Sequence, residues 1–318
     1  MSIDNLNSFL RRATSKMFPI CLGTIGAGLM WRQAAETLGA PALIGEIWLA
    51  LAVMLFALCA AYYARKLARR PAAILEDLGP VPARAAVSAA SMCTMLTAAA
   101  LVPYAPGLAA LLLLAGVAHH LIHAVMVLWV LVQSPPEERE INPTLYLPFV
   151  GQIVAPIAGV PLGYWTASAV IFWSAVVAWV LITVVSLHRI ISKPIPKSLR
   201  QSMVIFLAPT GVGVISADLL NAGWSSAIML VFGVAAGGFA IWLATRINWL
   251  VEGGWTPAWG AFTFPTVALA GAAMVFFDRV ASGALSALSW PFILGSTATV
   301  LFVLGRAIEA ALAGRRYS

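Results

Sequence analysis

The sequence predicts an all-α integral membrane protein of ten transmembrane helices, and three observations point to this class. Of the 318 residues, 61% are hydrophobic and only 10% are charged, whereas soluble domains carry about 25% charged residues. The mean hydropathy is +0.92. Apolar runs long enough to cross a hydrocarbon core of about 30 Å recur along the chain with short linkers. We therefore expect one transmembrane domain over residues 1–318, with short tails at about 1–16 and 313–318.

Ten apolar runs, taken in order, define the predicted spans. They cover residues 17–35, 42–64, 85–104, 107–133, 144–163, 165–188, 201–221, 224–246, 257–277 and 286–312. Because residues 1–16 are polar and the first run is long, no cleavable signal peptide is predicted. With alternating spans, 17 of the 19 basic residues fall on the N-terminal side, and only Arg32 and Arg279 fall on the other. Lys and Arg mark cytoplasmic loops, so both termini are predicted to be cytoplasmic and no nucleic-acid partner is needed to explain the basic charge.

The even-numbered and odd-numbered spans differ in composition. Even spans such as 42–64 and 107–133 are long and rich in Leu, Val, Ile and Trp, as suits helices that face lipid. Four odd spans pair proline with glycine: Pro19 with Gly23, Pro156 with Gly159, Pro209 with Gly213, and Pro265 with Gly271. The third span instead carries a small polar stripe, Ser88, Ser91, Thr94 and Thr97.

This contrast predicts how the helices are arranged. A proline inside a helix removes one hydrogen bond, and the freed carbonyl is tolerated at membrane depth only where protein, side chains or water reach it. We therefore expect five helical hairpins, in which kinked odd helices form an inner ring around a water-accessible pore and even helices form an outer ring. The alternative is that the prolines and small residues serve helix packing alone.

Side chains that could carry chemistry are few. Cys21, Cys59 and Cys93 lie in three different spans and are interpreted as packing residues. His119 and His123 are one turn apart, a spacing that can chelate a metal, but no acidic or cysteine partner is near, which favours histidines bonded within the bundle. There is no phosphate loop or nucleophile elbow, so no enzyme activity, cofactor or metal is predicted.

Charged residues near span ends are expected to play structural roles. Glu46 and Asp218 fall near the outer ends of their helices, where we expect them to be solvated. Arg306 and Glu309 are three residues apart, so we expect them to form a local ion pair.

Four segments of the chain resemble the tellurite-resistance and dicarboxylate transporter family, whose members include bacterial TehA and the plant guard-cell slow anion channels. They are FPICLG at 18–23, NPTLYLP at 142–148, RQSMVIFLAPTGVGVIS at 200–216 and NWLVEGGWTPAWGAFTFP at 248–265. The resemblance implies five repeated hairpins, a homotrimer with one pore per protomer, anion conduction and a bacterial inner-membrane location. It also implies that Phe264 plugs the pore. Pro19 departs from the family pattern, which usually has glycine there.

The Phe-Pro pair explains how one ring could close a path. On a helix Phe262 and Phe264 project about 200° apart, so at most one can face a central axis. We expect Phe264, beside Pro265, to block ions by dewetting and Phe262 to pack outward. The alternative reading of Phe264 is an ordinary core aromatic.

Selectivity is expected to rest on weak interactions. No Lys or Arg lies in the middle of an odd span, so we expect weak binding and fast passage of nitrate and chloride, with nitrate favoured, helped by backbone and hydroxyl donors at the kinks. A basic cytoplasmic rim should concentrate anions. It comprises Arg65, Lys66, Arg69, Arg70, Arg189, Lys193, Lys197 and Arg200.

Two other functions stay open at this point. A proton-coupled carrier of C4-dicarboxylates such as malate, or a tellurite-related transporter, would use arginine pairs or opposed helix N-termini at mid-membrane. Such arginine pairs are absent from the span centres, although broken helices could supply the N-termini. A non-conducting structural or sensor protein is the third reading.

Overall fold

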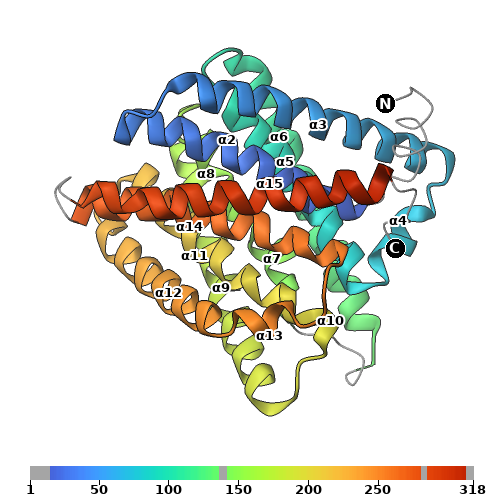
Figure 1. Ribbon diagram of the computed structural model, residues 1–318. Helices are drawn as coiled ribbons and strands as arrows, with labels where there is room; N and C mark the ends of the chain where they lie inside the picture. Colours follow the sequence, from blue (N-terminus) through green and yellow to red (C-terminus); the bar gives the residue numbers. More distant parts are fainter. Residues whose placement is uncertain (1–14, 136–141, 281–284, 313–318) are drawn as a thin grey trace.

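The computed structural model describes residues 15–135, 142–280 and 285–312, shown in Figure 1. Within these ranges every regular element is helical. Most of both expected tails lies outside the described residues, as do five basic residues of the topology argument, Arg11, Arg12, Arg139, Arg315 and Arg316.

Five long helices have largely exposed surfaces. In each of them only 22–28% of the most apolar 18-residue stretch is buried. Apolar helices with exposed flanks suit contact with lipid, and these helices correspond to the even-numbered predicted spans. They are α3 (Ala42–Arg69), α6 (Pro106–Gln133), α9 (Trp165–Ser192), α12 (Ser225–Thr245) and α15 (Trp290–Leu312).

The remaining long elements are buried. The corresponding stretches are 89% buried in α5 (Val81–Leu101), 78% in η5 (Gln201–Phe206) together with α11 (Leu207–Leu220), and 67% in α14 (Gly260–Val280). The helix α2 (Phe18–Leu38) is also mostly buried. Apolar helices hidden from the surface are inner helices, as expected for the odd-numbered spans.

Eight helices in the described part of the chain are long and apolar enough to cross a membrane, so this is a multi-pass membrane protein. The other two predicted spans differ from expectation. The helix α2 is not among the eight, and it carries Arg32 and Glu36 near its end. The expected single helix over 144–163 consists of four short segments, because prolines at its start and middle lack the N–H donors that would extend one helix. These are η3 (Pro143–Leu145), α7 (Tyr146–Val150), η4 (Gly151–Val154) and α8 (Pro156–Gly159).

The inner elements pack in a closed circuit. The helix α2 contacts α5 and α14, α14 contacts α11, α11 contacts η4 and α8, and these contact α5. Each inner element also packs against the outer helix that follows it, so α3 lies on α2, α6 on α5, α12 on α11 and α15 on α14 (Figure 1). The circuit surrounds a central space whose lining is set by inner-helix side chains.

Four prolines were expected to kink helices from the inside, but three of them lie within the first three residues of an α-helical segment. Pro19 lies in the first turn of α2, Pro156 begins α8, and Pro209 is the third residue of α11. Proline is tolerated in the first turn of α2 because the first helical N–H groups have no intrahelical partner. Pro156 and Pro209 instead lie where the 3₁₀ segments η4 and η5 pass into α-helix, so they mark a change of helix type within a longer helical run. Only Pro265 lies inside a described helix, and α14 continues through it.

Short elements join the long helices on the side where the inner helices begin. They are η1 (Ser15–Met17), α4 (Ala73–Leu78), α10 (Lys197–Arg200), α13 (Ile247–Val251) and η6 (Pro257–Trp259); η7 (Ser286–Ser289) precedes α15.

Candidate functional site: two cavities separated by Phe264

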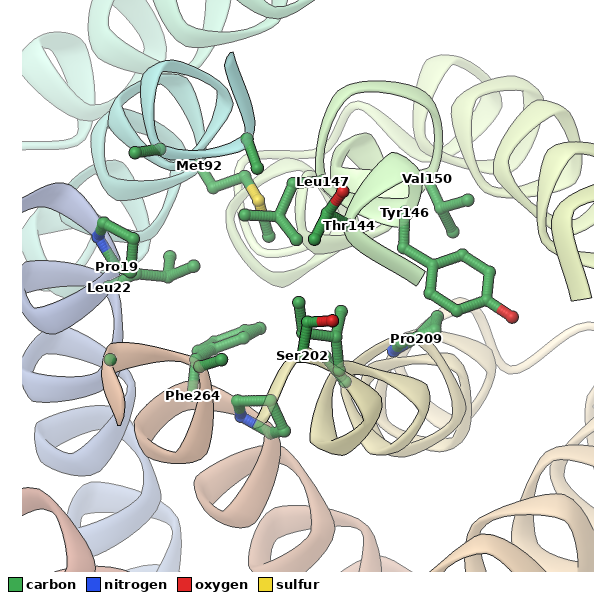
Figure 2. A pocket seen from close by; sticks show the side chains of 18 of the residues that line it. Pro19, Leu22, Met92, Thr144, Tyr146, Leu147, Val150, Ser202, Pro209 and Phe264 are labelled. Atoms are coloured by element: carbon green, nitrogen blue, oxygen red, sulfur yellow. The ribbon is translucent and has the colours of Figure 1, made fainter. Parts of the chain in front are cut away.

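Two cavities lie end to end inside the circuit. The first, of about 300 Å³, is lined by the starting turns of inner elements, including Pro19 of α2 and Ser202 of η5. We call it the proximal cavity; Figure 2 shows its lining side chains around a central opening. The second, the distal cavity, has a volume of about 440 Å³ and is lined by the final turns of the same helices, including Gln33 of α2 and Val275 of α14. Together they follow the inner helices over most of their length.

Among the described residues, two line both cavities, Val212 of α11 and Phe264 of α14. Phe264 is 6% exposed, and its ring lies at the edge of the proximal opening in Figure 2. Gly26 of α2 makes room for this ring, because a Cβ added there would lie 3.0 Å from the Phe264 Cδ2 atom. Phe264 and Val212 therefore lie where the two cavities adjoin.

The backbone around Phe264 is held by threonine hydroxyls. Thr263 Oγ1 shares its single proton between the carbonyls of Pro19 (3.1 Å) and Gly260 (2.8 Å), which ties α14 to the start of α2. Thr266 Oγ1 likewise shares its proton between the carbonyls of Phe262 (2.8 Å) and Thr263 (3.0 Å). These bonds give the Gly260, Phe262 and Thr263 carbonyls a side-chain donor in the turns around Pro265.

Phe262 occupies a different environment from Phe264. Its ring stacks on Trp259 with centroids 5.0 Å apart, and it lines neither cavity. The two phenylalanines thus point in different directions, as helical spacing predicts.

The other predicted pore-lining residues divide into two groups. Pro19, Pro209 and Pro265 line the proximal cavity, and Gly271 lines the distal one. The remaining four line neither cavity and serve packing instead. Gly23 faces Thr263, Gly159 faces Ser168 of α9, Gly213 faces Phe232 of α12, and Pro156 is buried at the start of α8.

The small polar stripe of α5 also packs rather than lining a cavity. Ser88, Ser91 and Thr94 each donate a hydrogen bond to a carbonyl of their own helix. Ser91 faces α6, where its Oγ lies 2.8 Å from His120 Nδ1.

His119 and His123 were expected to be bonded within the bundle, but the two buried histidines of α6 are His120 and His123. His119 lies on the exposed face of α6. His123 Nε2 lies 3.0 Å from the Arg84 carbonyl. Among the described residues no group of three His, Cys, Asp or Glu side chains could hold a metal, and Cys21, Cys59 and Cys93 are buried thiols.

Four of the eight predicted rim residues form ion pairs, with three acidic neighbours between them. Lys66 pairs with Asp77 (2.9 Å), and Arg70 pairs with Glu76 (2.6 Å).

Glu252, in the turn that follows α13, pairs with both Lys197 and Arg200. Hydrogen bonds from the Lys197 ammonium and then the Arg200 guanidinium hold the pKa of the Glu252 carboxyl below its ordinary value, so it stays ionised. The rim members for which no ion pair is found in the described part of the chain, Arg65, Arg69, Arg189 and Lys193, are exposed.

The charged lining of the distal cavity was not anticipated. Arg32 forms two hydrogen bonds with Glu46, of 2.7 and 2.8 Å, and Glu46 also accepts from Tyr104 (2.6 Å). Arg279 pairs with Asp218 at 2.8 Å. Glu46 and Asp218 are thus ion-pair partners rather than merely solvated acids. The sequence did contain a signal for these two ion pairs. Arg32 and Arg279 are the two basic residues assigned to the side opposite the cytoplasm, and Glu46 and Asp218 lie near the ends of their spans on that same side.

Described elements that are all helical, with buried inner helices, apolar outer helices and two opposed cavities, define a multi-pass membrane protein of the channel and transporter class. Residues 12–308 match the SLAC1 family, described as voltage-dependent anion channels. The chain therefore belongs to this family, which is not an enzyme class.

A search of known proteins also finds a plant relative. The chain is 24% identical to the S-type anion channel SLAH2 of Arabidopsis thaliana over 341 aligned residues, which cover 98% of this chain and 62% of the plant protein. The chain thus spans about three fifths of that relative's length. The family resemblance drawn from the four sequence segments is confirmed.

Proposed function

We propose that this protein is an anion channel in which small monovalent anions, such as nitrate and chloride, pass through the proximal and distal cavities of each protomer and are blocked at Phe264. The observation that carries this proposal is that Phe264 and Val212 line both cavities. Without the ring, the two cavities would merge into one path. Membership of an anion channel family supports anions as the cargo.

The block follows from hydration. An anion that meets an apolar ring finds no hydrogen-bond donor to replace its water shell, so a narrow aromatic constriction excludes it. Movement of the Phe264 ring would open the path. A weakly hydrated anion such as nitrate gives up its water at a lower cost than chloride, and we expect it to pass more readily.

The proposal includes ten spans arranged as five hairpins, with both termini in the cytoplasm of a bacterial inner membrane. The two additional spans are α2 and the segmented run 143–159. Packing of inner helices against the outer helices that follow them supports the hairpins, and the distribution of basic residues supports the orientation. A homotrimer rests on the family resemblance; the mass of the purified particle tests it.

Proteoliposomes test conduction against carriage. Vesicles containing Phe264→Ala protein should release nitrate down its gradient much faster than wild-type vesicles. The rate should keep rising with nitrate concentration and should not need a proton gradient.

The alternative is a proton-coupled carrier of C4-dicarboxylates or a tellurite-related transporter. One observation favours it: Arg32 and Arg279 both line the distal cavity, where they could receive two carboxylates. Both are already occupied by acidic partners, which speaks against this role. Saturable malate uptake that requires a proton gradient, without nitrate release, would favour the carrier.

A further inference from the structure

The proximal cavity has a mainly apolar wall with few polar side chains. Most of its lining residues are aliphatic residues, glycine or proline. The lining residues with a hydroxyl or charged group are Lys16, Thr144, Tyr146, Ser202 and Thr256. An anion entering this cavity needs hydrogen-bond donors, so the direction of each of these groups decides what the cavity can bind.

Three of the hydroxyl protons are donated to protein acceptors next to the cavity. Thr144 Oγ1 donates to Asn142 Oδ1 (2.6 Å), and Ser202 Oγ donates to the Leu199 carbonyl (2.6 Å). Thr256 Oγ1 donates to Gln201 Oε1 (2.8 Å). Because a hydroxyl has only one proton, these groups present acceptor lone pairs to the cavity.

The fourth hydroxyl, that of Tyr146, points away from the opening (Figure 2) and lies 2.6 Å from Thr183 Oγ1. Thr183 donates its own proton to the Trp179 carbonyl (2.6 Å), so Tyr146 donates to Thr183. The hydroxyl donors that the sequence led us to expect at the pore are therefore all committed elsewhere.

Lys16 is the remaining polar side chain, and it carries three N–H donors. It belongs to η1 and is half-buried between the buried residues Ser15 and Met17. None of the described residues that line the proximal cavity is acidic. Lys16 lines the cavity, and within the described residues it has no hydrogen-bond or ion-pair partner that would compete with a ligand for its ammonium.

The distal cavity differs in charge. Its lining includes two basic residues, Arg32 and Arg279, and three acidic ones, Glu36, Asp218 and Asp278. The charged side chains of the distal wall therefore have a net charge of −1, whereas Lys16 gives the proximal wall a charge of +1. An anion is thus favoured on the proximal side of Phe264.

We propose that Lys16 binds the permeating monovalent anion in the proximal cavity and thereby sets its concentration next to the Phe264 ring. This inference rests on the proposed function and adds a binding residue to it. A single ammonium at a partly hydrated site gives weak attraction, which is compatible with rapid release. Because the attraction is electrostatic, it should weaken as salt screens the charge.

The test compares Lys16 variants in a Phe264→Ala background by patch recording in nitrate. Lys16→Gln should lower the conductance about threefold at low ionic strength, and the loss should shrink at high ionic strength as charge screening increases. Lys16→Arg keeps the charge and should keep most of the conductance. Arg246→Gln is the control, because Arg246 is an exposed cation beyond the end of α12 and lines neither cavity.

The outcomes separate the two proposals. If the Phe264→Ala background conducts but Lys16→Gln matches it at low ionic strength, the Lys16 site is wrong and the channel stands. Equal losses in Lys16→Gln and Lys16→Arg at every ionic strength would show a structural effect and would also overturn the site. A silent background with verified membrane expression would overturn both proposals.

Discussion

Phe264 is positioned by its neighbours more than by its own chemistry. Gly26 of α2 leaves space for the Phe264 ring. Thr263 donates a hydrogen bond to the Pro19 carbonyl and so ties this turn of α14 to α2. Phe262, two residues away, stacks on Trp259 outside the cavities. Phe264 is a candidate gate because α14 places its ring where the two cavities adjoin. Phe262 has the same side chain but lines neither cavity.

Val212, like Phe264, lines both cavities. Val212→Ala should open a measurable anion leak, since it removes two methyl groups from the wall shared by the cavities. The leak should be severalfold smaller than that of Phe264→Ala, because the ring remains. Current recording of both variants measures the ratio.

Val214→Ala is the matched control for this prediction. Val214 is a fully buried valine on the same helix that lines neither cavity. If Val214→Ala leaks as much as Val212→Ala, loosened packing rather than the shared wall would explain the current.

At the scale of helices, the inner circuit depends on close backbone contact. A Cβ added to Gly211 of α11 would lie 2.6 Å from the backbone carbonyl atoms of Ala268 in α14. Such a contact with backbone leaves no flexible side chain to move aside. Small residues at crossing points are the means by which membrane helices approach closely.

Gly211→Ala should therefore push α11 and α14 apart and destabilise the protein by about 1–3 kcal/mol, as overpacking does. Thermal unfolding of the detergent-solubilised protein measures the change. Gly238→Ala on α12 is the control, because a Cβ there meets nothing within 4 Å and alanine favours a helix. Similar melting temperatures for wild type and Gly211→Ala would contradict the close contact.

Proline shows the limit of sequence reasoning at this scale. The prolines of the odd spans correctly marked the buried elements, but Pro19, Pro156 and Pro209 begin or nearly begin helices, and only Pro265 lies inside one. Proline is accepted at a first helical turn and disruptive in an interior, so its effect depends on a helix boundary that sequence locates poorly.

On the scale of the whole molecule, the two ends of the path differ in charge. The distal cavity contains Glu36 and Asp278, for which no ion pair is found within the described residues, whereas the proximal cavity contains Lys16 and no acid. Charged walls in a low-dielectric surrounding change the local concentration of ions.

Neutralising the distal acids should therefore act in the opposite sense to neutralising Lys16. In the Phe264→Ala background, the double variant Glu36→Gln with Asp278→Asn should raise nitrate conductance about twofold at low ionic strength, with less effect when salt screens the charges. Glu309→Gln, an exposed acid on α15 that pairs with Arg306 at 2.7 Å, should leave it unchanged. A decrease in conductance of the double variant would contradict this charge account.

Composition was enough to predict the membrane class, and the placement of proline and small residues along the chain was enough to predict which helices are buried and which are exposed. The expected Arg306–Glu309 pair is confirmed, since it lies within one turn. Other features depend on three-dimensional contacts that the local sequence pattern does not contain. They are the two cavities, the Arg279–Asp218 pair, and the hydrogen bonds in which Thr144 and Ser202 donate their hydroxyl protons.

In the proposed channel, the Phe264 ring closes the anion path. Voltage-clamp recording of wild type, Phe264→Ala and Phe262→Ala in nitrate and chloride baths tests whether it does. We expect a nearly silent wild type, a large anion-selective current from Phe264→Ala that is greater in nitrate than in chloride, and no such current from Phe262→Ala. Silence of Phe264→Ala at verified surface expression, or equal currents from the two alanine variants, would contradict the claim.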